Sequence, residues 1–235
     1  MTRSRIGFTF LLALLALAFA GFVALGIWQV HRLHWKEALI ARVDSRVTAP
    51  PVPAPPPPEW PHVTAGNAEY RHLRLTGQYI RGRDTLVQAS TDLGSGFWIL
   101  TPFESDRGFV ALVNRGFVPD REKIAPPSGE QQVTGLLRIT EPGGGFLRSN
   151  DPAADRWYSR DVAAIAKARG LGRIAPYFID ADRNANDDKG PVGGLTVIRF
   201  PNNHLSYAIT WFVLAIMTVI GAALLIRERF RSQKA

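Results

Sequence analysis

A histidine stands at the start of the last long apolar segment, where an ionisable side chain is unusual. The segment PNNHLSYAITW, residues 201–211, leads from His204 into a run that has no charge before Arg227. On a helix, Tyr207 and Trp211 lie on the side of His204, because they follow it at helical spacing. A neutral imidazole can coordinate haem iron, and aromatic walls could enclose the macrocycle. The alternative is an interfacial histidine that stays hydrated.

Aromatic and cationic side chains also gather at the end of the first apolar segment. Trp28 and Trp35 lie about one helical turn from Arg32 on either side, and Gln29 and Lys36 are neighbours. Arg32 could stack on either indole. Indole rings favour the membrane interface, so this set predicts the outer end of a transmembrane helix.

Few other residues could support metal or nucleophilic chemistry. The chain has no cysteine and five histidines, so thiolate chemistry is excluded. His31 and His34 are an i, i+3 pair, which could share a metal or simply lie on one helix face. Residues 180–191 fail as a calcium loop because Ala185 replaces the turn glycine and Pro191 the bidentate glutamate. We expect a solvated acidic turn there, and no enzyme, because no hydrolase signature is present.

Two apolar segments are long enough to cross a membrane as helices. Residues 6–28 and 205–226 contain no charged residue. Each covers about 33 Å as a helix, against a hydrocarbon core of about 30 Å. Ala18-Phe19-Ala20 imitates a signal-peptidase site, but the apolar run continues to Trp28. That run exceeds the core of a signal peptide, so we predict an uncleaved anchor.

The distribution of cations predicts the topology. Arg3 and Arg5 precede the first helix, and the tail 227–235 is basic. By the positive-inside rule, residues 1–5 and 227–235 are cytoplasmic, and the segment between the helices is translocated. The net charge of +8 therefore reflects membrane topology, and we expect membrane lipid and no nucleic acid as a partner.

The segment between the spans predicts one domain on a stalk. The first helix should continue to about residue 48, since no Gly or Pro interrupts 28–48. Residues 49–61 are rich in proline and predict a stiff linker without regular structure. Residues 62–204 then form the expected periplasmic, β-rich domain.

Seven short runs rich in β-branched, aliphatic and aromatic residues predict strands, because Gly, Pro and Asp separate them. These runs are 70–80, 84–90, 96–103, 108–118, 131–140, 175–180 and 194–200. A single helix is expected within 159–170, with Ser159 or Asp161 as its N-cap and Gly170 as its stop. The predicted fold class is therefore two transmembrane α-helices, N- and C-terminal, that flank a mainly antiparallel, barrel-like β domain with some helix.

Several segments together carry a family resemblance. LGIWQVHRLHWK, GFWILTPF, VNRGFVP, RWYSRDVAAIA, PYFID and PNNHLSYAITWF occur in this order between the two helices. The chain thereby resembles the Surfeit-locus-one family of cytochrome oxidase biogenesis proteins from Leu25 to Phe212. Asn114 and Arg115 match its V-N-R-G pattern, and we expect a structural role for Arg115, holding carbonyls or a carboxylate of a neighbouring strand.

The resemblance implies an assembly factor for haem-copper oxidases that handles haem a and delivers it to the catalytic subunit, beside other assembly factors. It implies that His204 is the best candidate for the axial ligand of the haem iron, with Tyr207 and Trp211 as pocket candidates. Trp28, Gln29 and Arg32 would face the same leaflet, and Arg32 could pair with a haem propionate.

Two functions remain open from the sequence. One is the haem-handling factor, and the other is a cofactor-free scaffold that stabilises an oxidase assembly intermediate. The family occurs in mitochondrial and bacterial membranes. Only residues 1–5 precede the first helix, which leaves no room for a transit peptide, so we expect a bacterial inner membrane.

Overall fold

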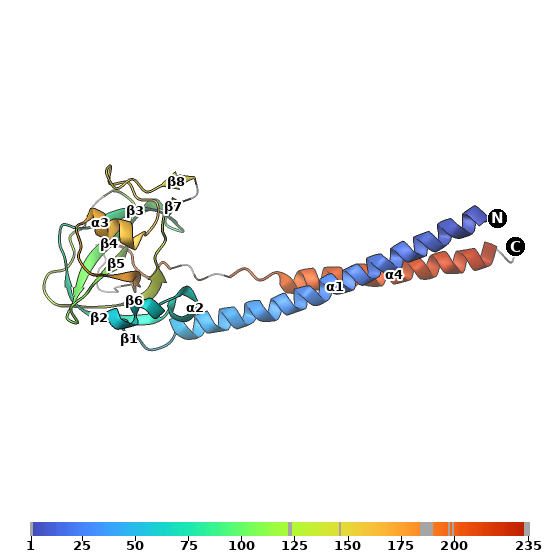
Figure 1. The fold of residues 1–235 in the computed structure, drawn as a ribbon, viewed down its shortest axis with the longest axis horizontal. Coiled ribbons are helices and arrows are strands. Elements are labelled where there is room, and N and C mark those ends of the chain that lie inside the picture. Colours follow the sequence, from blue (N-terminus) through green and yellow to red (C-terminus); the bar gives the residue numbers. More distant parts are fainter. Residues whose placement is uncertain are drawn as a thin grey trace. The chain divides into compact units, whose positions relative to one another are not determined.

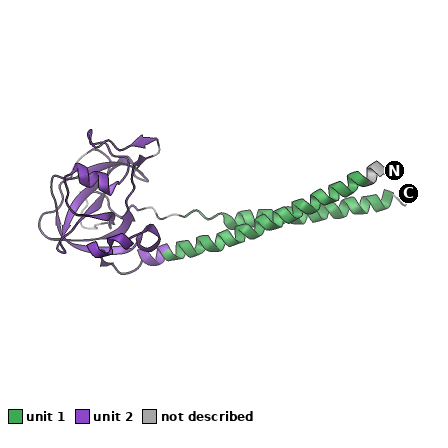
Figure 2. Ribbon diagram, in the orientation of Figure 1, with its two compact units in different colours: residues 1–42, 199–235 green, residues 43–198 purple. Residues whose placement is uncertain are grey.

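The computed structural model describes residues 2–121, 124–145, 147–183, 190–196, 198 and 200–232. The chain forms two compact units (Figure 2), one of residues 1–42 with 199–235 and one of residues 43–198. The first unit consists of helices α1 (Thr2–Val47) and α4 (His204–Ser232), apart from the last turn of α1. Both helices are long and apolar enough to cross a membrane.

The two helices pack antiparallel in the first unit (Figure 1). Near the chain ends, Phe8 contacts Arg229. Further along, Phe22 stacks on Trp211 at 5.8 Å between ring centroids. At the start of α4, His204 contacts Gln29 of α1. The helices approach closely where Gly26 faces Phe212: a Cβ on Gly26 would lie 2.7 Å from the Phe212 ring. We call this packed surface between α1 and α4 the helix seam.

The second unit is a closed, mixed β barrel (Figure 1). Its strands are β2 (His72–Tyr79), β4 (Gly94–Ser105), β5 (Val110–Val118), β6 (Gln131–Ile139) and β9 (Ile174–Ala181). Neighbours run in the order β2-β6-β9-β5-β4, and β4 pairs again with β2 to close the ring. All of these pairs are antiparallel except β5 with β9. The predicted barrel-like domain between two terminal helices is confirmed.

Smaller elements extend or cover the barrel. Strand β3 (Thr85–Thr91) extends β4 as a hairpin, and α3 (Val162–Ala168) packs Val162 and Ile165 into an apolar cluster with Phe178. The Asp161 side chain caps α3 by accepting the N–H of Ala164 at 3.0 Å, as one of the two predicted caps. The remaining elements are β1 (Val52–Pro53), η1 (Pro57–His62), α2 (Ala65–Ala68), β7 (Gly144–Gly145) and β8 (Arg148–Ser149).

The proline-rich segment differs from the expected free linker. Its strand β1 pairs in parallel with β2, and Ala54 is buried in the main core. The carbonyl of Pro55 accepts hydrogen bonds from Trp60 Nε1 at 3.0 Å and from the Tyr177 hydroxyl at 2.8 Å. Prolines lack a donor but keep their carbonyl, so they fit at a sheet edge that only accepts bonds. The compact unit accordingly begins at residue 43 rather than at 62.

The last predicted strand, 194–200, is also different. Its described residues form no strand, and Val197 and Arg199 lie outside the described residues. Val192 makes an isolated bridge with Phe117, and Gly194 donates to the Ala181 carbonyl at 3.0 Å. The segment therefore holds to the barrel through separate contacts, because β5 already pairs with β4 and β9.

Candidate functional site: a histidine in the helix seam and a charged cluster in the barrel

The helix seam holds a polar pair where the charge-free run of α1 ends and that of α4 begins. His204 is the first residue of α4, and its Nδ1 lies 2.7 Å from Oε1 of Gln29 on α1. The Asn202 side chain accepts the His204 backbone N–H at 3.4 Å, and the Asn203 carbonyl accepts that of Tyr207 at 3.2 Å. These two bonds stabilise the first turn of α4, which starts at His204. The position of the helix start therefore determines the position of the imidazole.

The bond with Gln29 defines which ring nitrogen can bind a metal. An amide oxygen can only accept a hydrogen bond, so Nδ1 of His204 carries the hydrogen in this pair. Nε2 then keeps its lone pair, and a neutral imidazole binds metals through such a nitrogen. Nε2 has no protein partner among the described residues, so the geometry leaves it available.

Trp211 lies in the same seam and carries an unused donor. Its ring stacks on Phe22 at an interplanar angle of 22°. Within the described part of the chain, its Nε1 is the only buried side-chain nitrogen or oxygen without a hydrogen-bond partner. An unpaired N–H away from water costs about 1–3 kcal/mol. The seam therefore presents one open metal-binding nitrogen and one open hydrogen-bond donor.

The other predicted site residues lie apart from this pair. Tyr207 and Trp28 are each 55 % exposed, and Arg32 is exposed with its guanidinium 4.1 Å from the Trp35 ring centroid. The structure therefore brings His204 and Trp211 into the helix seam and places Tyr207, Trp28 and Arg32 on the outer surfaces of the helices.

The second histidine pair does not assemble a metal site in the described part of the chain. His34 and His31 are exposed, and His34 Nδ1 lies 3.5 Å from Glu37 of the next turn. No group of three or more histidine, cysteine or acidic side chains able to hold a metal ion occurs among the described residues. An axial haem ligand needs only one such side chain.

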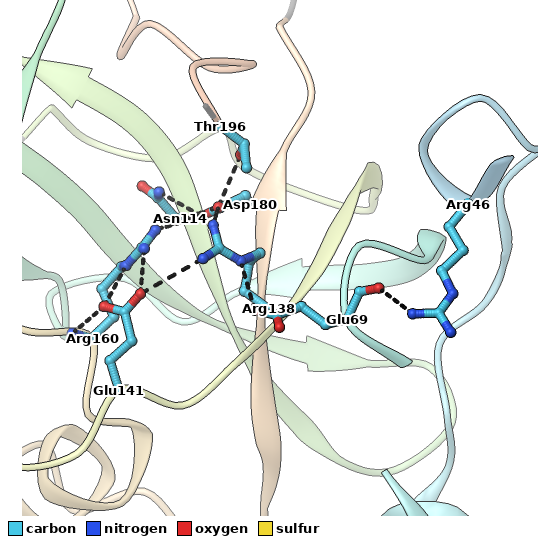
Figure 3. Close-up of polar contacts among 8 residues, drawn as sticks. All are labelled: Arg46, Glu69, Asn114, Arg138, Glu141, Arg160, Asp180 and Thr196. Atoms are coloured by element: carbon cyan, nitrogen blue, oxygen red, sulfur yellow. Dashed lines mark hydrogen bonds and ion pairs between the residues drawn. The ribbon is translucent and has the colours of Figure 1, made fainter. Parts of the chain in front are cut away.

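The barrel contains the second polar region, which is built around Asp180 at the end of β9 (Figure 3). Asp180 is only 5 % exposed. Its carboxylate accepts hydrogen bonds from Asn114 at 2.8 Å, Thr196 at 2.9 Å, and the guanidinium groups of Arg138 and Arg160 at 3.1 Å each. Four N–H or O–H donors of this kind compensate for the burial of the carboxylate. We call these residues with Glu141 and Glu69 the charged cluster.

Glu141 completes the cluster on the other side of Arg160. It accepts from Nη2 of Arg160 at 2.5 Å and from Nε at 3.0 Å, which is a bidentate pair. Burial alone would raise the pKa of Glu141, but its hydrogen bonds with Arg160 and the nearby Arg138 hold that pKa below its ordinary value. The pKa of Arg160 is raised, since Asp180 and Glu141 outweigh the effect of its burial.

The cluster joins the first and last segments of the barrel (Figure 3). Arg46, in the last turn of α1, donates to the carbonyls of Glu69 at 3.1 Å and Gly66 at 2.7 Å. The Glu69 carboxylate accepts from Arg138 Nε at 3.4 Å, and Arg138 in turn contacts Asp180. Thr196 extends the cluster into the segment that follows the barrel. Side chains far apart in sequence are thus held by one carboxylate.

A cavity of about 270 Å³ opens beside the cluster. Its lining includes Arg138, Arg160 and Asp180 of the cluster together with Ser90, Thr91, Trp98 and residues 193–196. These charged groups are already paired with one another. The cavity therefore offers no charge that lacks a protein partner, and it is explained by the structural role of the cluster.

The V-N-R-G segment is structural, as expected. Arg115 donates to the carbonyls of Ile124 at 2.7 Å and Ala125 at 3.2 Å, and it lies 4.0 Å from the Asp84 carboxylate. The neighbouring Asn114 belongs to the charged cluster. Sequence reasoning placed Arg115 correctly but gave Asn114 no partner.

The sequence did not predict two features of these sites, the burial of Asp180 and the contact of Gln29 with His204. Asp180 was assigned to a solvated acidic turn over 180–191, but the structure buries it, while residues 184–189 lie outside the described residues. The acidic composition of 180–191 concealed that Asp180 is the last buried position of an apolar strand, APYFID. Gln29 was noticed only as a neighbour, and its position next to a charge-free run was the available signal.

Comparisons with known proteins fit this arrangement. A profile of the SURF1 family matches residues 16–216. Surfeit locus protein 1 of Rattus norvegicus is 38 % identical over 232 residues, covering 89 % of this chain and 72 % of the rat protein. Surfeit locus protein 1 of Homo sapiens is 36 % identical over 220 residues, covering 83 % of this chain and 70 % of the human protein. The chain is a member of the SURF1 family.

Proposed function

We propose that this protein is an assembly factor for haem-copper cytochrome c oxidases and that it holds haem a for the catalytic subunit through His204. Membership of the SURF1 family supports the role in oxidase assembly. The observation that carries the haem role is the His204–Gln29 pair, with Nδ1 of His204 bonded at 2.7 Å. With Nδ1 as the donor, Nε2 of a neutral imidazole is the nitrogen left for a metal.

The residues of the helix seam fit a haem group. Nε2 of His204 would hold the iron of the haem group, which would be the cargo of this protein. The unpaired N–H of Trp211 can donate to an oxygen atom at the periphery of the ligand. Arg32 and Trp28, which are exposed on α1, are available to a propionate or a ring that extends beyond the seam. A site this open suits a carrier, because a carrier must release its cargo.

The chain's own part in this function is binding and release. The proposal assigns it no bond-making step and thus no enzymatic role. The partners would be the catalytic subunit of the oxidase and further assembly factors. Handover would exchange His204 for a ligand of the receiving protein, since an exposed position beside the seam leaves room for an approaching partner.

The membrane position follows from charge and helix direction. The two spans are antiparallel, so both chain ends emerge on one side, and the arginines 227, 229 and 231 favour the cytoplasm for that side. The barrel would then be periplasmic in a bacterial inner membrane. The relatives named above are from animals, and the bacterial location stays a prediction that fusions of reporter enzymes to each end and to the barrel would test.

The visible spectrum of the detergent-purified protein tests the haem role. The protein is expressed in a host that makes haem a, next to His204→Ala at equal yield and equal helix content. We expect haem a absorption in the native protein and its loss in His204→Ala. A native protein without haem that still co-purifies with oxidase subunits would contradict the haem role.

A cofactor-free scaffold is the second candidate function, and one observation favours it. Tyr207 and Trp28 are each 55 % exposed on the helices. Exposed aromatic side chains on membrane helices can instead contact an oxidase subunit. Under this function, Tyr207→Ala would weaken co-purification of the oxidase subunit, and His204→Ala would leave it unchanged.

A further inference from the structure

We infer that Gln29 is a positioning residue for His204: it holds the imidazole in the Nδ1–H form and so leaves Nε2 as the metal-binding nitrogen. This inference deepens the proposed function and rests on it for the identity of the ligand. Gln29 was not among the predicted site residues, and no feature of α1 by itself assigns it such a role.

The burial of Gln29 is the first observation. Its residue is 8 % exposed, although it directly follows the charge-free run 6–28 on a membrane-spanning helix. A buried amide without a partner costs free energy, and more so in a membrane where water cannot replace the bond. The only side chain that the structure gives it as a partner, within the described residues, is His204 on α4.

The direction of the bond is the second observation. Oε1 of Gln29 faces Nδ1 of His204 at 2.7 Å, and this oxygen can accept but cannot donate. Neutral imidazole has one donor and one acceptor nitrogen, so a donor at Nδ1 fixes Nε2 as the acceptor. In metalloproteins, a partner on the second nitrogen of a ligating histidine fixes its tautomer and orientation and raises its basicity.

The packing around the pair is the third observation. Gly26, one turn before Gln29, lets the Phe212 ring approach α1, and Ala208, one turn after His204, is 2 % exposed. These small residues bring the two helices close enough for a direct bond between short polar side chains. At 2.7 Å, Oε1 of Gln29 and Nδ1 of His204 leave no room for a water molecule between them. The seam therefore lets the Gln29 oxygen determine which tautomer the imidazole adopts.

Nitrogen-15 NMR of the haem-free protein in detergent micelles tests the tautomer directly. His204→Ala identifies the His204 signals among the five histidines. We expect a protonated Nδ1 and an unprotonated Nε2 in the native protein. In Gln29→Leu, which keeps the volume and removes the acceptor, we expect the Nε2–H form to gain population. A native protein with a protonated Nε2 and a bare Nδ1 would overturn the inference, whatever the haem result.

Titration with haem a tests the consequence for binding. Gln29→Leu should bind haem about 10- to 100-fold more weakly than the native protein, which is the usual effect of losing a partner of a ligating histidine. Gln29→Glu places a stronger acceptor at the same position, and it should lower the midpoint potential of the bound iron. A residue that only joined the two helices would not move that potential.

Thr218→Val is the matched control. Thr218 lies on α4 in the same helix pair and bonds only within its own helix, to the Ala215 carbonyl at 2.6 Å. Its variant removes one polar group from the span but should leave haem affinity, potential and tautomer unchanged. Equal haem affinity of the native protein and Gln29→Leu would overturn the inference, whereas a native protein that binds no haem would overturn the proposed function.

Discussion

The helix seam and the barrel both bury polar side chains, and they do so in opposite ways. In the barrel, Asp180 is bonded by four side chains, and the two arginines beside it are paired with further acids. In the seam, a single pair, His204 with Gln29, leaves one ring nitrogen open, and Trp211 has an unpaired N–H. A cluster in which every donor and acceptor has a protein partner stabilises one fold. Donors and acceptors without a protein partner can instead form hydrogen bonds or coordination bonds with a ligand.

The comparison also separates two kinds of charge. The barrel contains ion pairs whose charges balance one another, and the seam contains an imidazole with a single side-chain partner. Ionised groups are very costly in a membrane, while a neutral ring can be held by one hydrogen bond. The difference fits the division of the chain, because the unit able to cross a membrane carries the hydrogen-bonded imidazole and the barrel carries the salt bridges.

The largest expected effect comes from removing the centre of the charged cluster. Asp180→Asn leaves Arg138 and Arg160 buried with one negative charge less. Loss of one partner from a buried ion pair costs about 3–5 kcal/mol, so thermal unfolding of the barrel, followed by near-ultraviolet circular dichroism, should occur at a much lower temperature. Haem binding by the seam should survive at temperatures where the variant barrel is folded.

The control for this variant is Asp92→Asn, in the exposed β3–β4 turn. It removes the same charge and should change stability by less than about 0.5 kcal/mol. Equal stability of the two variants would show that Asp180 is not the centre of the charged cluster.

Acid should weaken the barrel through Glu141. The pKa of this carboxyl lies below its ordinary value of 4.5, so the folded barrel binds its proton less readily than the unfolded chain does. The contribution is fully present above about pH 4.5 and is lost as the pH falls through the lowered pKa of the folded state. Unfolding in urea at several pH values should show this loss, and Glu141→Gln should show a smaller dependence. An unchanged slope in Glu141→Gln would assign the acid sensitivity to other carboxyls.

Thr196→Val tests the contact between the cluster and the segment after the barrel. The hydroxyl donates to Asp180 at 2.9 Å, and its loss leaves a carboxylate that still has three other partners. We expect a loss of about 0.5–1.5 kcal/mol in unfolding free energy. Hydrogen exchange of the amides in 190–196 should increase more than exchange in β2 and β6, and uniform exchange would contradict a local role.

The smallest effect is expected in the seam and has the opposite sign. Trp211→Phe keeps an aromatic ring against Phe22 and removes the unpaired N–H. The relieved donor should offset the lost ring volume, giving the haem-free protein an equal or slightly higher stability, within about 1 kcal/mol. The same variant should bind haem a more weakly in a spectroscopic titration. Lower haem-free stability with unchanged haem binding would make Trp211 a packing residue only.

Local sequence was sufficient for the elements, because hydropathy and turn residues act over a few positions. The charge-free runs predicted both long helices, and alternating apolar runs predicted β2, β3, β4, β5, β6 and β9 at nearly their observed positions. The failures share one cause. Residues 49–61 have the composition of a linker, but part of this segment pairs with the edge of β2. Residues 194–200 have the composition of a strand, but β5 is already paired on both sides, with β4 and β9.

The sequence by itself determined that the chain has two membrane-type helices around a β domain, and that His204 stands at the start of the second. Only the tertiary structure decided which partner each polar group has. Gln29 and His204 are separated by 175 positions, and Asp180 gathers side chains from two strands and two loops. A hydrogen bond depends on atoms within about 3 Å, and the closure of the barrel and the packing of the helices bring such distant residues that close.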